Sequence, residues 1–131
     1  MFVQNLNERQ QSALLHYADA VMRVDNRVEP SELVAMDLLR DQAHPGVQPK
    51  DVPVDQLGEL FKNRIGRVSF LLELVGMGYV NDDFDPRQSI LIDEVAAALD
   101  MRDDGTLEAV ESWVVDQLEL MKKAQQLMQG R

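Results

Sequence analysis

Apolar residues recur every three or four positions along most of this chain, which is the spacing of one face of an α-helix. The first stripe consists of Leu14, Leu15, Ala18, Val21 and Met22. It follows Asn7-Glu8-Arg9-Gln10, which resembles a capping box, with Asn at the N-cap and Gln three residues later. The pattern therefore predicts a first helix that ends near Arg23.

A second helix is predicted to begin at Pro30 and to end near Gln42. Proline suits the first helical position because the N–H that it lacks has no partner there. The next stretch, residues 43–54, contains three prolines and a glycine, which oppose regular structure. We expect a long and mobile loop of about twelve residues, a length that is uncommon inside a compact domain.

Four further helices are predicted in the second half. Leu57, Leu60 and Phe61 indicate a short one. Residues 64–75 are apolar on most sides, which is typical of a central, buried helix, and Gly76 and Gly78 are expected to end it. The turn over residues 82–86 leads into a helix with Asp85 as N-cap, and a last helix has apolar positions from Leu107 to Met128.

No stretch alternates convincingly between apolar and polar residues with period two, as a half-buried strand would. The pattern thus predicts an all-α protein, a compact bundle of about six helices. A length of 131 residues fits a single domain over residues 1–131.

Two acidic turns between helices resemble each other when the numbering is shifted by 79. Asp25, Glu29 and Glu32 then fall on Asp104, Glu108 and Glu111. Asn26 falls on Gly105, and these residue types tolerate a left-handed backbone best. We interpret the chain as two copies of a helix–acidic turn–helix unit, and expect any function to lie at the two turns.

Carboxylates three residues apart share a face of a helix, so each turn is predicted to present a glutamate pair with an aspartate nearby. The predicted metal ligands are Asp25, Glu29, Glu32, Asp104, Glu108 and Glu111. Oxygen ligands of this kind suit Ca²⁺, Mg²⁺ or Mn²⁺. A true EF-hand loop is rejected, because Arg23 and Arg102 stand at the third loop position, where a cation would oppose Ca²⁺.

The same acids also have a purely structural interpretation. Acidic residues in the first turn of a helix complement its dipole and cap free N–H groups. Glu29 to Glu32 would then be nothing more than a helix start, and Arg23 and Arg102 would neutralise the neighbouring carboxylates. Spacing alone leaves both interpretations open.

Charge and composition exclude several classes of function. The net charge is −10, and residues 81–119 carry all of it, with twelve acids and two bases. Nucleic-acid binding is disfavoured, because phosphate backbones require clustered Lys and Arg. The chain has no cysteine, no apolar run of transmembrane length and no basic-then-apolar leader, so we expect a cytoplasmic protein without membrane insertion.

The doubled pattern Asp-(Gly/Asn)-x-(Val/Leu)-x-x-x-Glu, placed between two Ala-rich apolar helices, resembles the TerB-like family of tellurite-resistance operons. Its positions here are Asp25, Asn26, Val28, Glu32, Asp104, Gly105, Leu107 and Glu111. The resemblance covers roughly residues 14–121. It implies an all-helical, non-enzymatic domain with an acidic cluster that is associated with divalent cations, in a stress-response context.

Three functions compete at this point. The first is an adaptor that binds a divalent cation at its acidic turns. The second is a metal-independent interaction module, which would meet a basic protein partner or form a homodimer through Met121 and Met128. The third, an enzyme, has least support: there is no catalytic motif, and of the two histidines His16 is expected to be a hydrogen-bonded core residue and His44 lies in a loop.

Overall fold

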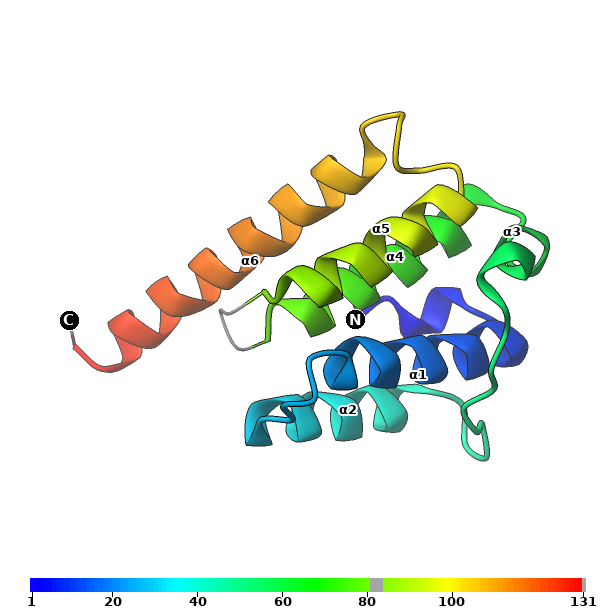
Figure 1. Cartoon of the computed structure of the whole chain (residues 1–131). Coiled ribbons are helices and arrows are strands. Elements are labelled where there is room, and N and C mark those ends of the chain that lie inside the picture. Colours follow the sequence, from blue (N-terminus) through cyan, green and yellow to red (C-terminus); the bar gives the residue numbers. More distant parts are fainter. Residues whose placement is uncertain (81–83, 131) are drawn as a thin grey trace.

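A computed structural model describes residues 1–80 and 84–130. These residues form six α-helices and two short 3-10 helices, with no strand among them, so the all-α prediction is confirmed (Figure 1). The elements are η1 (Val3–Asn5), α1 (Glu8–Arg23), α2 (Pro30–Gln42), η2 (Val54–Gln56), α3 (Leu57–Leu60), α4 (Arg64–Gly78), α5 (Pro86–Ala98) and α6 (Thr106–Met128). Within the described residues, no helix is long and apolar enough to cross a membrane.

The helix starts follow the capping signals of the sequence. Asn7 Oδ1 accepts the Gln10 N–H at 2.9 Å, and Gln10 Oε1 accepts the Asn7 N–H at 2.9 Å, which completes the predicted capping box of α1. Asp85 caps α5 and accepts the Arg87 N–H at 2.8 Å. Of the turn predicted before α5, residues 81–83 lie outside the described part of the chain.

Helix α4 is the central element, as its apolar sequence predicts. It contacts α1, α5, α6 and η1, and the side chains of Phe70, Leu71 and Leu74 are fully buried. The predicted end is wrong in one respect, because the helix continues through Gly76 and ends at Gly78. Gly78 packs directly against the Phe84 ring. The absence of a side chain at Gly78 leaves room for this ring beside the last turn of α4.

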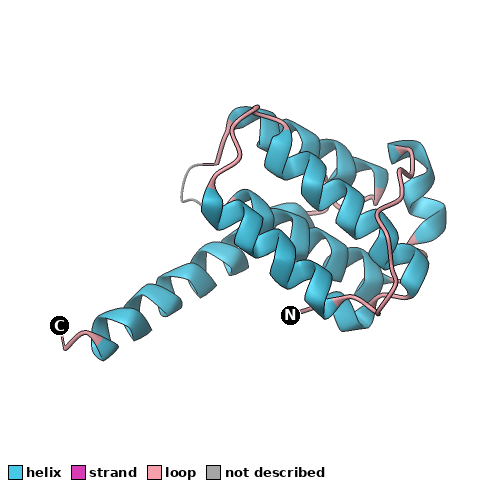
Figure 2. Ribbon diagram, turned by 90° about the horizontal axis from the view of Figure 1, so that it is seen from below, coloured by secondary structure: helices cyan, strands magenta, loops and turns pink. Residues whose placement is uncertain are grey.

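The helices are arranged in layers. Figure 1 shows α1 and α2 on one side, α4 and α5 in the middle, and α6 across the other side. Both views show the C-terminal half of α6 extending beyond the other helices (Figures 1 and 2). The core therefore lies between α1, α4, α5 and the first half of α6, with Met36 and Leu39 of α2 also buried in it, and α6 packs against it as far as Leu118.

Arg67 ties three elements together. Its guanidinium donates hydrogen bonds to the backbone carbonyls of Phe61, Gly58 at 3.0 Å and Leu99 at 3.1 Å. The Leu99 carbonyl lies at the C-terminal end of α5, where a helix leaves carbonyl groups without intrahelical partners. A single cation on α4 therefore holds α3 and the end of α5 in place.

The predicted loop is irregular from residue 43 to residue 53, and 3-10 helix η2 begins at Val54. Several of its backbone groups are bound to α1. The Lys50 N–H donates to the Ser12 carbonyl at 3.0 Å, and the His44 N–H donates to Gln11 Oε1 at 2.8 Å. These bonds hold the loop against the side of α1.

The prediction of a core position for His16 is wrong. Its side chain is 34% exposed, and its Nε2 lies 3.3 Å from Asp51 Oδ1 in the loop. The stripe of α1 faces the core with Leu14, Leu15 and Ala18, and His16 falls at the edge of that face. The apolar periodicity identified the buried face of α1. It could not show that the loop places Asp51 beside His16 at the edge of that face.

Candidate functional site

The first acidic turn links α1 to α2. Asp25 Oδ1 accepts the Arg27 N–H at 3.0 Å, and Asn26 between them has a φ of 60°. The left-handed backbone predicted at Asn26 is therefore confirmed. The side chain of Asp25 is engaged with its own turn.

The two glutamates of this turn do not present a matching pair of carboxylates. Glu29 is exposed at the N-cap of α2. Glu32 is only 2% exposed, and its Oε1 accepts the Glu29 N–H at 3.0 Å. The helix begins so close to Glu32 that this carboxylate turns back to the backbone, as the structural interpretation of the acids expects.

The second acidic turn links α5 to α6 and begins in the same way. Asp104 Oδ1 accepts the Thr106 N–H at 2.9 Å, and Gly105 has a φ of 86°. Hydrogen bonds from the backbone and side chain of Thr106 hold the pKa of Asp104 below its ordinary value, and the charge of Arg64 lowers it further. This carboxylate is thus ionised and already bonded.

Further along α6, two glutamates lie near an aspartate of α5. Glu108 is exposed and Glu111 is half-buried. Burial raises the pKa of Glu111 above its ordinary value, and the charges of Glu108 and Asp93 raise it further. These three carboxylates repel one another.

The two arginines at equivalent positions of the predicted repeat, Arg23 and Arg102, pair with acids other than the six predicted ligands. Arg23 Nε lies 3.0 Å from Asp19 Oδ1 within α1. Arg102 lies 3.3 Å from both Asp93 and Asp103. A third arginine, Arg87, donates to the Asp25 backbone carbonyl at 3.3 Å and so connects the first turn to α5.

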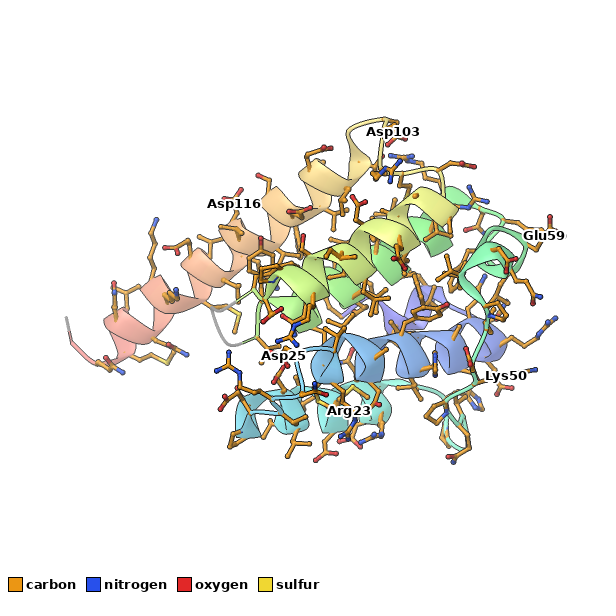
Figure 3. All side chains as sticks on the ribbon, viewed as in Figure 1. Arg23, Asp25, Lys50, Glu59, Asp103 and Asp116 are labelled. Atoms are coloured by element: carbon orange, nitrogen blue, oxygen red, sulfur yellow. The ribbon has the colours of Figure 1, made fainter. Side chains whose placement is uncertain are left out.

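The six predicted ligands do not form one cluster. Figure 3 labels Asp25 in the first turn and Asp103 in the second, and the two turns lie well apart. Among residues 1–80 and 84–130, no group of three or more His, Asp or Glu side chains is arranged to hold a metal ion. In the second turn, Glu108 and Glu111 lie near each other with Asp93 close by, and in the first turn Glu29 and Glu32 are joined through the capping box of α2.

An apolar groove between α4 and α6 is the feature that sequence reasoning missed. It has a volume of about 580 Å³ and is open to solvent. Its apolar lining includes Phe2, Val68, Leu72, Ala109 and Trp113, and Arg64, Asp104 and Thr106 stand at one end. We call this the α4–α6 groove.

A smaller recess of about 200 Å³ continues the α4–α6 groove toward the end of α6. The two hollows share Phe2, Leu72 and Trp113, and the smaller one reaches Met121. The rings of Phe2 and Trp113 meet edge to face, with their centroids 5.4 Å apart. The mainly apolar hollow therefore follows α6 as far as Met121, with Glu73 and Gln117 also in its lining.

Beyond the bundle, every residue from 119 to 130 is exposed. We call residues 119–128 the free end of α6 (Figure 2). Its large apolar side chains are Leu120, Met121, Leu127 and Met128, with exposed fractions of 65%, 53%, 77% and 80%. The sequence indicates this end through the length of its last apolar stripe, because α6 is longer than the helices beside it.

Comparison of the chain with protein families, with curated proteins and with solved structures finds no match. The TerB-like resemblance rests on the sequence motif alone and stays a prediction. The geometry of the molecule itself is therefore the basis for a functional proposal.

Proposed function

We propose that this chain is a non-enzymatic interaction module that binds a protein along the α4–α6 groove and the free end of α6. The observation that carries this proposal is the mainly apolar pair of adjoining hollows from Val68 and Trp113 to Met121, followed on the free end by exposed Leu120, Leu127 and Met128. Large contiguous apolar patches on a folded surface are characteristic of interaction sites. A groove between two helices suits an amphipathic helix, which lays its apolar face into it.

The edges of this surface provide specificity. Arg64 and Asp104 stand at one end of the groove, where a partner would meet charge of both signs. Trp113 is 41% exposed in the middle of the surface, and tryptophan is enriched among residues that dominate interface energies. An adaptor of this kind is compatible with the stress-response context that the TerB-like resemblance implies.

Site-specific photo-cross-linking in the source cells tests the proposal. Ala109 is exposed and lines the groove, so Ala109→p-benzoylphenylalanine would place a cross-linker in the site. We expect a cross-linked protein product at this position. The matched control is Arg40→p-benzoylphenylalanine, at an exposed site on α2. Equal cross-linking at both positions, or none at Ala109, would contradict the proposal.

A second candidate function is weak binding of a divalent cation at the Glu108–Glu111 pair, with Asp93 nearby. Burial and, after it, the charges of Glu108 and Asp93 raise the pKa of Glu111, and a cation would relieve the repulsion between these carboxylates. Calorimetric titration with Ca²⁺, Mg²⁺ and Mn²⁺ tests the idea. Heat that disappears in the Glu108→Gln/Glu111→Gln double variant would support it, and heat that is unchanged there, or absent at millimolar metal, would remove it.

A further inference from the structure

The groove and the free end are two uncovered apolar surfaces on one helix. Ala109, Trp113, Leu120, Ala124 and Leu127 follow one another at intervals of three, four or seven residues, so they share one face of α6. The first two lie beside α4, in the groove, and the last three lie beyond the bundle. Asp116 and Gln117 lie on the same face between Trp113 and Leu120, so the face has two apolar parts with a polar turn between them. Helix α6 therefore carries both an exposed apolar end and one wall of a groove that could bind such an end.

We propose that a second copy of this chain covers both surfaces. The two α6 helices pair antiparallel, so that the free end of each lies in the α4–α6 groove of the other. This inference rests on the proposed function, because it names the partner of that same surface. The resulting contact is self-complementary, as a twofold-symmetric dimer requires.

The length of α6 allows this register. If the twofold axis passes near Leu118, Leu127 of one copy comes level with Ala109 of the other, because each is nine residues from the axis. At 1.5 Å per residue, the overlap from residue 109 to residue 127 spans about 27 Å. Leu127 of each copy then meets the groove at Ala109 of the other, about one helical turn from Trp113.

Charge favours the antiparallel arrangement. The free end contains Lys122, Lys123 and a single acid, Glu119, which lies 3.8 Å from Lys122, so its net charge is +1, whereas residues 81–119 carry a net charge of −10. Asp116 is exposed on the first part of α6 (Figure 3). Antiparallel pairing brings the basic free end of each copy alongside the acidic part of the other, but parallel pairing would place like charges together.

Sedimentation of the full chain over a range of concentrations tests the inference. We expect a reversible dimer. We also expect the emission of Trp113, the only tryptophan, to move to shorter wavelength as the dimer forms and covers it. Leu127→Glu/Met128→Glu should raise the dimer Kd by about a hundredfold or more, because it places carboxylates in an apolar and acidic site.

The variant should fold normally, since both side chains are at least 77% exposed in the single chain. The matched control is Leu33→Glu/Val34→Glu, which changes two exposed apolar residues of α2 and should leave the dimer intact. Lys122→Glu/Lys123→Glu should weaken the dimer by roughly tenfold at low salt and much less at high salt. A dimer that the Leu127→Glu/Met128→Glu change leaves intact would overturn the inference.

Cysteine cross-linking tests the direction of the helices, because the chain has no cysteine of its own. Chains with Ala109→Cys and chains with Leu127→Cys should form a disulfide when they are mixed, and little when each is alone. A parallel pair would give the opposite result. Self-linking of either variant that exceeds the mixed product would therefore overturn the antiparallel arrangement.

The outcomes separate this inference from the proposed function. A chain that stays monomeric at every concentration overturns the second copy as partner. If photo-cross-linking from Ala109 then yields a product with a different protein, the interaction module still stands. If it yields nothing, both fail.

Discussion

The turn between α1 and α2 and the turn between α5 and α6 begin alike. In each, an aspartate accepts the N–H two residues later, at 3.0 Å for Asp25 and 2.9 Å for Asp104. The residue between has a positive φ, 60° at Asn26 and 86° at Gly105. After these three residues the two turns diverge.

The position at which the next helix starts causes the divergence. Helix α2 begins at Pro30, so Glu32 is its third residue and caps the backbone. Helix α6 begins at Thr106, so Glu111 lies more than one turn inside it, beyond the reach of any free N–H. The spacing from aspartate to glutamate is the same in both turns, yet the glutamates perform different tasks.

The largest effect is expected at the buried glutamate. Glu32→Ala removes the acceptor of the Glu29 N–H and should lower the free energy of unfolding by about 2 kcal/mol. Glu111→Ala, at the matching position of the second turn, should change it by less than about 0.5 kcal/mol. Urea unfolding followed by circular dichroism measures both.

Glu32→Gln is the control, because the amide oxygen can still accept the Glu29 N–H. It should retain most of the stability of the unaltered chain. Equal losses for Glu32→Ala and Glu111→Ala would mean that the two turns are equivalent after all.

A smaller effect on stability is expected at the positive-φ residue that the two turns share. Gly105→Ala should cost about 1 kcal/mol, because the φ of 86° is left-handed and strains a residue that has a Cβ. A Cβ there would meet nothing within 4 Å, so the cost would come from the backbone alone. Asn26→Gly should change the stability little. Thermal unfolding checks both, and a neutral Gly105→Ala would contradict the argument.

Local signals in the sequence were sufficient to predict most of the fold. Asn7, Pro30 and Asp85 each marked a helix start to the residue, because a cap acts within its own turn. The 3-10 helix η1 was missed because its support is distant. Glu73 of α4 accepts the Phe2 N–H at 2.8 Å, across 71 positions of the chain.

The candidate site was less predictable. The left-handed positions Asn26 and Gly105 followed from residue type. The capping role of Glu32 depended on which residue begins α2. The α4–α6 groove required knowledge of which helix packs beside α6. Periodicity assigns Trp113 to a face of a helix and does not say where the covering helices end.

The pH dependence of stability that comes from Glu111 should further distinguish the second turn from the first. The raised pKa of Glu111 means that the folded chain holds this proton more tightly than the unfolded chain. The associated stability is present below the unfolded value of 4.5 and is lost as the pH rises through the higher folded value. Glu111→Gln should therefore match the unaltered chain near pH 4 and exceed it by a few tenths of a kcal/mol at pH 7. A variant that is less stable at pH 7 would contradict this.

The smallest effect is expected at Asp104, with the opposite sign. Its lowered pKa means that the ionised form stabilises the folded chain above the unfolded pKa of 3.8, and that this stability is lost as the pH falls through the lower folded value. Asp104→Asn retains an oxygen for the Thr106 N–H but lacks the charge. The unaltered chain should have the slightly higher urea midpoint at pH 7, and the difference should vanish on acidification. If the difference grew toward low pH instead, the hydrogen bonds from Thr106 would not be favouring the charged carboxylate, and the resemblance of the two turns would be one of backbone shape alone.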